Sequence, residues 1–345
     1  MISFLRRLLL LPGFCLLAST VPAAPHAEKS AATTDFPPNA YRGASVIDAA
    51  TGQLLFEDKA DVQNPPASVV KLMTFLIVQD KIREGELTLT TPVTIPAQAA
   101  KMGGSEAWLM DKEVVPVEEL LYLLMVQSAN DAAMALAIQT AGSKEAFVDL
   151  MNARARALGM THTEYHSPHG LPPGRGQEPD LSTARDLALL CRELIAKTDI
   201  LRYTSNRSHE FRHANGVVNK FQNHDHLLGT LPGCDGLKTG WYAKAGYSIA
   251  LTVQRHGRRV IAVILGSPQR ELRDNVATRL IERGFAALPP APIPAAPPAA
   301  TPATPPGPES SSIKPVPLSP AEKESLDHGP DTSPAVHVDL SKTKK

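Results

Sequence analysis

Segments with strand character lie at the two ends of the globular part of this chain, and segments with helical character lie between them. Residues 43–48 and 53–57 predict two strands joined around Thr51-Gly52, and residues 247–253 and 259–265 predict a second hairpin. This order favours an α/β fold in which the terminal strands share one sheet around a helical middle. The apolar spacing predicts helices over 68–84, 117–141, 144–158, 183–196 and 274–284.

Both ends of the 345-residue chain differ in composition from this globular part. At the N-terminus, Arg6 and Arg7 precede an apolar run over 8–17, and small residues near Ala23 suit signal peptidase cleavage. After Leu288 the chain is rich in Ala, Pro, Ser and Thr, and such a segment buries too little apolar surface to fold. The predicted organisation is a signal peptide over 1–23, a flexible lead over 24–38, a folded catalytic domain over 39–287 and a disordered tail over 288–345.

The overall composition narrows the class of protein. The chain has 35 basic and 35 acidic side chains, which argues against nucleic-acid binding, and its apolar fraction of 43% is enough for a packed core. The N-terminal apolar run is short for a membrane span, and no later segment is apolar enough for one. We therefore expect a periplasmic or secreted protein without a stable membrane anchor. Cys191 and Cys234 follow the cleavage site, and the sequence does not say whether they pair.

Ser68 and Lys71 lie three residues apart at the start of a predicted helix, directly after two prolines. Residues at this spacing share one face of a helix, and the helix dipole at its N-terminus favours negative charge on an attacking oxygen. A lysine must be neutral to accept a proton, and burial or a second cation lowers its pKa. Taken alone, the pair is better explained by a helix-capping serine and an exposed lysine.

Two further motifs favour the catalytic interpretation. Ser128-Ala129-Asn130 lies in an apolar segment, and Lys238-Thr239-Gly240 precedes a strand-like run. Ser-x-x-Lys, Ser-x-Asn and Lys-Thr-Gly together form the signature of penicillin-binding proteins and serine β-lactamases. Over residues 41–285 the chain resembles the low-molecular-mass penicillin-binding proteins, the serine D-alanyl-D-alanine carboxypeptidases of peptidase family S11. The resemblance rests on the segments PASVVKLMT, SANDAAMALA, FVDLMNARARALGMTHTEY, HGL, STARDLA, DGLKTG, KAG and VILGSPQRELR.

The resemblance implies a β-lactamase/transpeptidase-like fold, an antiparallel sheet flanked by helices with an inserted helical subdomain. It implies a hydrolase that removes the terminal D-alanine from peptidoglycan stem pentapeptides, needs no cofactor or metal, and is inhibited by covalently bound β-lactam antibiotics. Such an enzyme acts in peptidoglycan biosynthesis, cell wall organisation and cell shape. The best-known members also have a C-terminal β domain and an amphipathic membrane helix, and this chain has the Pro-rich tail in their place.

The resemblance also assigns a role to each predicted site residue. Ser68 is the expected nucleophile, Lys71 its base, and Ser128 the group that relays protons to the leaving amine. Lys238 is expected to help keep Lys71 neutral. Substrate binding is assigned to Asn130 for the amide, to Lys238, Thr239 and Arg273 for the terminal carboxylate, to Gly240 of the same motif, and to the backbone N–H group of Trp241, which completes an oxyanion hole with that of Ser68.

Departures from the family pattern leave the fine substrate preference open. Ala129 stands where glycine is commoner, Tyr242 where threonine is usual, and Asp225 where an asparagine is usual. A D,D-endopeptidase acting on cross-linked peptidoglycan would carry the same motifs and differ at the rim of the groove. A class A-like serine β-lactamase needs a glutamate that activates water, and Glu178 lies in a partial match to the loop that carries it.

Interpretations from other classes are weaker. His162-x-Glu-x-His166 resembles a zinc motif, but its glutamate is displaced by one position and Pro168 follows closely. We interpret these histidines, together with His169 and the pair in His224-Asp225-His226, as turn and surface residues. A non-catalytic cell-wall binder is disfavoured because all three motifs are intact.

Overall fold

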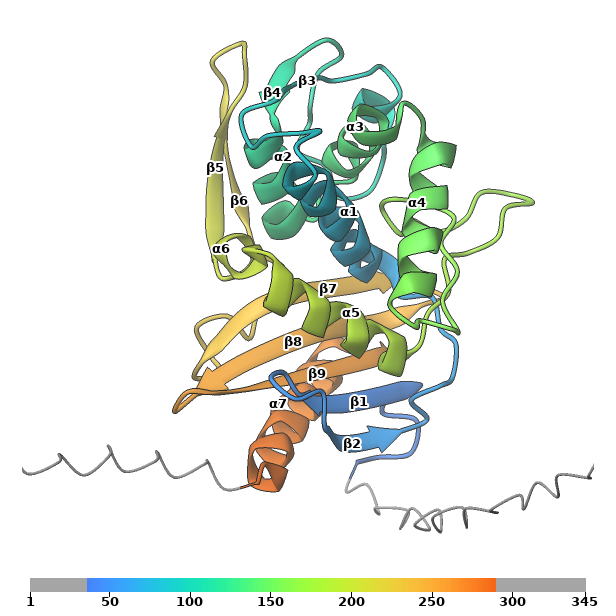
Figure 1. Cartoon of the computed structure of the whole chain (residues 1–345), viewed down its shortest axis with the longest axis vertical. Helices are drawn as coiled ribbons and strands as arrows, with labels where there is room; N and C mark the ends of the chain where they lie inside the picture. Colours follow the sequence, from blue (N-terminus) through green and yellow to red (C-terminus); the bar gives the residue numbers. More distant parts are fainter. Residues whose placement is uncertain (1–35, 290–345) are drawn as a thin grey trace, which may run out of the picture. The chain divides into compact units, whose positions relative to one another are not determined.

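The computed structural model describes residues 36–289 (Figure 1). The predicted signal peptide, nearly all of the predicted lead and the tail beyond Pro289 lie outside this range and stay predictions. At the start of the described range, Phe36 packs edge-on against Tyr41, with 6.0 Å between the ring centroids. None of the helices within residues 36–289 is long and apolar enough to cross a membrane.

A five-stranded antiparallel sheet joins the two ends of the described chain. In β1, Val46 lies opposite Ala262 and Ile47 lies opposite Ile261 of β9. Successive side chains of a strand point to opposite faces, so these two pairs are buried in different cores. The predicted α/β fold with both terminal hairpins in one sheet is confirmed. The strand order is β2 (Leu54–Asp58), β1 (Gly43–Asp48), β9 (Arg258–Ser267), β8 (Gly246–Arg255) and β7 (Cys234–Tyr242).

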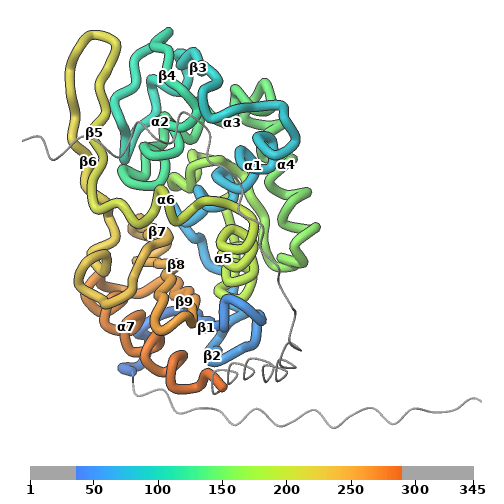
Figure 2. Tube along the Cα trace, turned by 60° about the vertical axis from the view of Figure 1, so that its left-hand side comes forward, coloured from blue at the N-terminus to red at the C-terminus, as the bar shows by residue number. Residues whose placement is uncertain are grey.

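Helices cover both faces of this sheet (Figure 1). On one face, α7 (Arg270–Ala287) buries Leu280 in the same core as Val46. On the other face, α5 (Ala184–Lys197) buries Leu187 in the core that also contains Ile47. The edge strand β7 borders the helical region, which Figure 2 shows from a second side. β7 is therefore the strand that faces the inserted helices.

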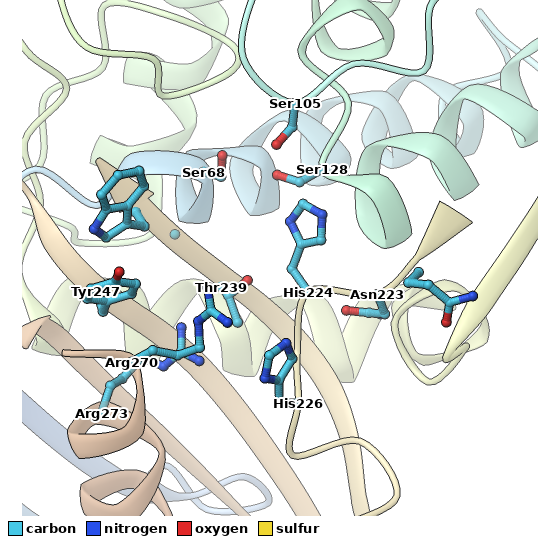
Figure 3. Close-up of a pocket in the computed structure, with 13 residues that line it drawn as sticks. Ser68, Ser105, Ser128, Asn223, His224, His226, Thr239, Tyr247, Arg270 and Arg273 are labelled. Atoms are coloured by element: carbon cyan, nitrogen blue, oxygen red, sulfur yellow. The ribbon is translucent and has the colours of Figure 1, made fainter. Parts of the chain in front are cut away.

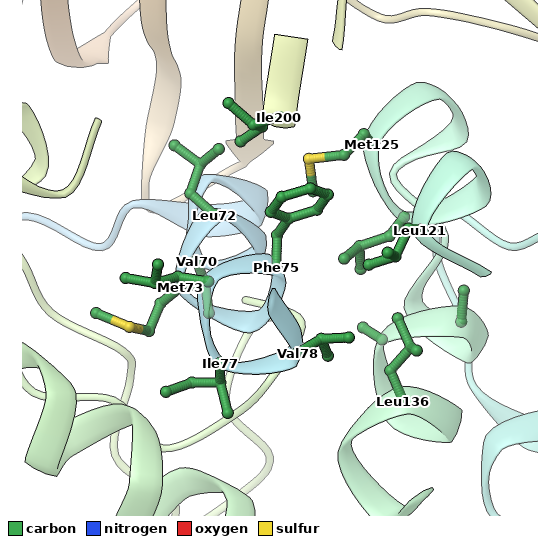
Figure 4. Close-up of a cluster of buried hydrophobic side chains, with 14 of the residues drawn as sticks. Val70, Leu72, Met73, Phe75, Ile77, Val78, Leu121, Met125, Leu136 and Ile200 are labelled. Atoms are coloured by element: carbon green, nitrogen blue, oxygen red, sulfur yellow. The ribbon is translucent and has the colours of Figure 1, made fainter. Parts of the chain in front are cut away.

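The helix α1 (Lys71–Arg83) lies at the centre of the helical region and follows a 3-10 turn, η1 (Ala67–Val70). Its first two turns are buried on every side, whereas the sequence pattern placed the apolar residues on one side. Figure 4 shows Phe75 directed toward η3 while Met73 and Ile77 point the other way. The remaining elements of this region are β3 (Pro92–Thr94), η2 (Ala99–Lys101), β4 (Val114–Pro116), α2 (Val117–Tyr122), the π-helical η3 (Leu123–Gln127), α3 (Asn130–Ala141), α4 (Lys144–Ala157), α6 (Ile200–Thr204), β5 (Ser208–Arg212) and β6 (Val218–Gln222).

Three differences from the predicted elements bear on the site. Ser68 lies in a 3-10 turn, and the α-helix begins three residues later at Lys71. The predicted helix over 117–141 is broken at Ser128, whose φ of 61° places it in the left-handed region. The motif Lys238-Thr239-Gly240 lies inside strand β7 rather than before a strand. Ser68 therefore lies just before an α-helix, Ser128 lies at a break between two helices, and Lys238-Thr239-Gly240 lies in the strand that faces the helical region.

The two cysteines do not pair. Cys191 is buried in α5 and Cys234 begins β7, and both are free thiols. Burial raises the pKa of Cys234 to about 12, which keeps this thiol protonated at neutral pH. The fold is therefore held by its two cores and not by a disulfide within the described residues.

Candidate active site

A cleft of about 530 Å³ lies between the helical region and strand β7. Figure 3 shows the hydroxyl groups of Ser68 and Ser128 pointing into it from the helical side, with Thr239 on the opposite side. All three sequence motifs therefore meet at one place. The lining residues also include Ser105, Gln222, Asn223, His224, His226, Gly240, Trp241, Tyr247, Arg270 and Arg273.

Two glycines bring neighbouring segments against the turn that carries Ser68. A Cβ atom on Gly240 would lie 2.4 Å from the carbonyl oxygen of Pro66 and 3.1 Å from the backbone nitrogen of Ser68. A Cβ atom on Gly170 would lie 2.1 Å from the carbonyl oxygen of Ala67. No side chain fits at either position, so the sequence needs glycine where β7 and the 169–171 segment touch this turn.

The amine of Lys71 is fully buried and contacts three oxygens. Its Nζ lies 3.0 Å from Oγ of Ser68, 2.7 Å from Oδ1 of Asn130 and 2.7 Å from the carbonyl oxygen of His169. Nδ2 of Asn130 donates to the carbonyl of Gly103, which fixes Oδ1 toward the lysine. Two of the three oxygens therefore only accept hydrogen bonds. A neutral amine donates to both and keeps its lone pair for the hydrogen of the Ser68 hydroxyl.

The electrostatic surroundings of Lys71 favour this neutral form. Burial lowers its pKa well below the ordinary value, and the positive charge of Lys238 lowers the pKa further. The carboxylates of Asp131 and Asp180 act in the opposite direction. The net direction is downward, which favours the neutral amine that a base must be.

Ser128 is positioned by the break between η3 and α3. Its left-handed backbone ends η3, and the backbone N–H group of Asn130 then donates to the carbonyl of Ser105 at 2.8 Å. The Ser128 hydroxyl is buried and has no hydrogen-bond partner within residues 36–289. Because it lines the cleft, this hydroxyl remains able to bond a group bound there.

Side chains along β7 alternate between two environments. Gly240 faces η1, and Lys238, two residues earlier on the same side, is buried close enough to Lys71 to lower its pKa. Thr239 and Trp241 lie on the opposite side, where the 55%-exposed Trp241 stacks on Tyr247 at 5.5 Å between ring centroids. Burial lowers the pKa of Lys238 to about 7, and its Nζ donates to the carbonyl of Thr239 at 3.1 Å.

Two arginines from α7 supply positive charge at the cleft. Arg273 is 2% exposed, and its Nε and Nη2 donate to Oδ1 of Asp274 at 2.8 and 2.6 Å. Its Nη1 lies 3.4 Å from the carbonyl oxygen of Ser248. Arg270, one turn earlier in α7, lines the same cleft (Figure 3). Arg273 is therefore a buried cleft residue and not a surface arginine.

Asp225 adds a buried carboxyl group near these cations. Its Oδ1 accepts from the backbone N–H group of Leu227 at 2.9 Å, and its Oδ2 has no partner among the residues the structure describes. Burial raises the pKa of Asp225, while Arg273 and Lys238 lower it. In turn, the charge of Asp225 raises the pKa of Lys238. The charges of Asp225 and Lys238 are therefore coupled.

Comparison with known proteins places the chain in a family. The profile of the S11 peptidases, described as D-alanyl-D-alanine carboxypeptidase, matches residues 31–269. The chain belongs to this family. D-alanyl-D-alanine carboxypeptidase DacC of Escherichia coli (strain K12) is 35% identical over 272 residues, or 76% of this chain and 65% of the relative. D-alanyl-D-alanine carboxypeptidase DacF of Bacillus subtilis (strain 168) is 30% identical over 245 residues, or 71% and 62%. The chain thus spans less than two thirds of the length of these relatives.

Solved structures confirm the expected S11 fold. Penicillin binding protein 6B from Escherichia coli superposes with a TM-score of 0.66 at 31% identity, covering 76% of this chain and 82% of the other. Penicillin-binding protein D2 from Listeria monocytogenes, in its ampicillin-bound form, gives a TM-score of 0.64 at 31% identity, covering 71% and 97%. The antiparallel sheet with an inserted helical region is therefore the transpeptidase-like fold.

In this S11 protein the segment His169-Gly170-Leu171 acts through its backbone. The sequence marked this segment as part of the resemblance but gave it no role. Its first residue supplies the carbonyl that accepts from Lys71. His169 lies at a bend, where its Nδ1 accepts from the N–H group of Leu171, so its interpretation as a turn residue holds. Its ring is buried, so it is not a surface residue.

Asp180 holds this segment in place. Its Oδ1 accepts from the backbone N–H groups of His166 and Ser167, and its Oδ2 accepts from the Ser167 hydroxyl at 2.7 Å. The same hydroxyl accepts from the N–H group of Gly170 at 2.9 Å. A carboxylate therefore positions, through two steps, the loop that contacts Lys71. The sequence gave no direct signal for this role.

Glu178 lines a different cavity, of about 400 Å³, and not the cleft that contains Ser68.

The histidines considered as metal ligands do not form a metal site among the described residues. His224 and His226 line the Ser68 cleft, where desolvation and the charge of Lys238 lower the pKa of His224 to about 4. Over residues 36–289 no cluster of three His, Cys, Asp or Glu side chains is arranged to hold a metal ion.

Proposed function

We propose that this S11 protein is a serine D-alanyl-D-alanine carboxypeptidase that removes the terminal D-alanine from peptidoglycan stem pentapeptides. The observation that carries the proposal is the buried amine of Lys71, 3.0 Å from Oγ of Ser68 and held by two oxygens that only accept hydrogen bonds. The lone pair of the neutral amine then faces the Ser68 hydroxyl. A serine becomes a nucleophile when a base in this position takes its proton.

In the acylation step, Oγ of Ser68 bonds to the carbonyl carbon between the two D-alanines as its proton passes to Lys71. The oxyanion accepts hydrogen bonds from the backbone N–H groups of Ser68 and Trp241, and the loss of one such donor costs about 3 kcal/mol of barrier. The proton held by Lys71 then passes through the hydroxyl of Ser128 to the amine of the departing D-alanine. The C–N bond breaks, the acyl group remains on Ser68 as an ester, and Lys71 is neutral again. Water then attacks the ester as its proton passes to Lys71, and Lys71 returns this proton to Oγ of Ser68 as the ester bond breaks.

The strand side of the cleft suits the free carboxylate that distinguishes a carboxypeptidase substrate. Thr239 and Arg273 line the cleft, and the buried amine of Lys238 donates to the backbone carbonyl of Thr239. Charge-assisted hydrogen bonds to a carboxylate are about twice as strong as neutral ones. On the acyl side, one N–H of the Asn130 amide is used by Gly103, and its second N–H remains for a substrate carbonyl.

The same acylation chemistry accounts for covalent binding of β-lactam antibiotics, whose strained amide takes the place of the D-alanyl-D-alanine bond. A class A-like β-lactamase would in addition need a glutamate beside the acyl-enzyme. Glu178, the residue that suggested this alternative, is exposed and lines the second cavity. We therefore expect slow release of the penicilloyl group and not rapid turnover.

The place of action follows from the substrate. Stem peptides lie outside the cytoplasmic membrane, and the predicted signal peptide over residues 1–23 would direct the chain there. We infer a periplasmic or secreted enzyme. Recovery of the mature protein in the soluble exported fraction after a salt wash would support this, and firm retention in membranes would contradict it.

The decisive experiment is intact mass after incubation with benzylpenicillin, followed by peptide mapping. We expect one adduct, on Ser68, with a lifetime of minutes or longer. Release of D-alanine from a stem pentapeptide and from cross-linked dimers then separates the carboxypeptidase from the D,D-endopeptidase alternative. An adduct on another residue, or none in the folded protein, would refute the proposed nucleophile.

A further inference from the structure

A second cleft, of about 630 Å³, borders the Ser68 cleft at Trp241. Trp241 lines both clefts, so its exposed indole forms the wall that they share. Beyond it, the lining includes Ala243 from the turn after β7 and Ser267 from the end of β9, together with Tyr41, Arg42 and Lys59. Nothing in the chemistry proposed above uses this second cleft.

Arg42 is held in a fixed position at this cleft. Its Nη1 donates to Oδ1 of Asn64 at 2.6 Å. Asn64 is buried, and its Nδ2 donates to the carbonyls of Pro65 and Ala245, so only its oxygen end can meet the arginine. The stem of Arg42 packs over Gly266, where a Cβ atom would lie 2.8 Å from Cγ and Cδ of the arginine. The segment that leads to Ser68 therefore positions the guanidinium.

The charged side chains that line this cleft are the cations Arg42 and Lys59. Neither forms an ion pair with a carboxylate in the described part of the chain. Of the acidic residues close to Lys59 in sequence, Glu57 and Asp61 pair with Arg185, and Asp58 acts on Tyr41, whose pKa is raised by burial and by the charge of Asp58. A pre-positioned guanidinium, a second cation and an exposed aromatic wall suit a ligand that carries a carboxylate.

The geometry of the first cleft indicates which part of a substrate would reach the second. Thr239 and Arg273 are the proposed partners of the terminal carboxylate, so the leaving D-alanine lies on their side of Ser68. An extended peptide aligned with the edge strand β7 then continues past Trp241 toward Ala243. Its upstream residues would enter the cleft that contains Arg42.

Building on the proposed carboxypeptidase function, we propose that the second cleft is a subsite for the acyl side of the substrate. In this subsite Arg42 and Lys59 bind a carboxylate on a residue upstream of the scissile bond, and Trp241 separates it from the reacting atoms. The subsite would make the enzyme prefer stem peptides whose upstream carboxylate is free over those in which it is amidated.

The test uses two pentapeptides that end in D-alanyl-D-alanine and differ at one group. In one peptide the second residue is a glutamate with a free α-carboxylate, and in the other this group is the carboxamide. We expect the wild-type enzyme to have a kcat/KM about fivefold higher for the carboxylate peptide, as suits a partly exposed charge pair. The ratio of the two kcat/KM values, and not either value alone, reports on the subsite.

Three variants then locate the effect. Lys59→Gln is expected to lower the ratio, and Arg42→Gln with Lys59→Gln to bring it near one. Lys244→Gln removes an exposed neighbouring cation that does not line the cleft and should keep the wild-type ratio. Lys59→Gln alone provides the test if loss of the Arg42–Asn64 hydrogen bond impairs folding.

The outcomes separate the subsite from the proposed function. Hydrolysis of both peptides at equal rates by the wild type, or an unchanged ratio in the Lys59→Gln variant, would overturn the subsite and leave the carboxypeptidase activity in place. An equal fall in the ratio for Lys244→Gln would also overturn it, because general charge attraction would then be the cause. If the folded wild type cleaves neither peptide and forms no penicillin adduct, the proposed function fails and the subsite with it.

Discussion

The two walls of the Ser68 cleft differ in how far their polar groups are already bonded within the protein. On the helical wall, Nζ of Lys71 has three oxygen partners at 3.0 Å or less, and both ends of the Asn130 amide are engaged. On the strand wall, Nζ of Lys238 donates to the carbonyl of Thr239 alone among the described residues, and Asp225 keeps one carboxylate oxygen without a partner there. The Ser128 hydroxyl, also without a partner in residues 36–289, is the exception on the helical wall.

This difference separates two tasks. The groups proposed for proton transfer are oriented before any substrate binds, so little reorganisation is needed at the moment of reaction. Among the groups proposed for binding the carboxylate, Lys238 keeps unused hydrogen-bonding capacity that an anionic substrate can occupy, whereas Arg273 is already bonded to Asp274 and Ser248. Burial lowers the pKa of Lys71 well below its ordinary value and that of Lys238 to about 7, and the positive charge of Lys238 lowers the pKa of Lys71 further.

The largest expected effect comes from removing the amine of Lys71, the proposed base on the helical wall. Lys71→Met keeps the apolar stem and removes the amine, so we expect the rate of acylation by benzylpenicillin to fall by about 10³-fold. The measurement is the rate of adduct formation by mass spectrometry. Lys81→Met, on the surface of the same helix, is the matched control and should acylate at the wild-type rate. Rapid acylation of the Lys71→Met variant would remove Lys71 from the role of base.

A smaller loss is expected when the two walls are forced apart. Gly240→Ala places a Cβ atom 2.4 Å from the carbonyl oxygen of Pro66, so β7 or the Ser68 turn must move. A displacement of about 1 Å at a reacting centre costs about 100-fold in rate. We expect kcat/KM for the pentapeptide to fall by that order, with a lower melting temperature. Gly103→Ala, where a Cβ atom meets nothing within 4 Å, is the control and should be much milder.

The effect of the Lys238 charge on the pKa of Lys71 predicts a shift in the pH profile of kcat/KM. Acylation needs neutral Lys71, so its rate should rise as pH increases through the pKa of Lys71. The charge of Lys238 lowers that pKa, and its removal in Lys238→Gln should therefore move this acidic limb to higher pH. On that limb the variant should therefore react more slowly than the wild type at the same pH. The measurement is kcat/KM against pH, and an unmoved limb would show that Lys238 does not tune the base.

In the wild type the strand wall sets the alkaline limb. Lys238 loses its proton above about pH 7, so carboxylate binding should weaken and KM should rise there. The exposed Lys244→Gln substitution provides the control for both limbs, because it removes a cation outside the cleft. A KM that stays constant between pH 6 and 9 would argue against Lys238 as a carboxylate ligand.

The smallest expected effect comes from Asp225, the buried carboxyl group whose charge raises the pKa of Lys238. The negative charge of Asp225 raises the pKa of Lys238, so Asp225→Asn should move the alkaline limb to lower pH, by less than one unit. Burial raises the pKa of Asp225, so the folded state binds that proton more tightly than the unfolded state and loses stability as pH rises through this pKa. An asparagine does not titrate, so the free energy of unfolding of the variant should fall less than that of the wild type as pH rises toward neutrality. Chemical denaturation measures it, with Asp111→Asn as an exposed control.

The sequence predicted the sheet of terminal strands, the main helices and the three motifs that line the cleft. Those predictions succeeded because periodicity and side-chain chemistry are local signals. The two small two-stranded sheets, β3–β4 and β5–β6, were not predicted, since their short strands carry little periodicity. The one-sided pattern of α1 was also misleading, because neighbouring helices bury its first turns on every side.

The sequence by itself therefore determined which side chains could perform acyl transfer and the family to which the chain belongs. Only the tertiary structure decided what surrounds them. The carbonyl of His169 holds Lys71 from 98 positions away, and every residue has a carbonyl, so no side-chain pattern marks it. The hydrogen bond from Arg42 to Asn64, and the closeness of Gly240 to the Ser68 turn, likewise join residues that are distant in the chain. Such contacts depend on how the sheet and helices pack, and packing is not encoded in any local stretch of sequence.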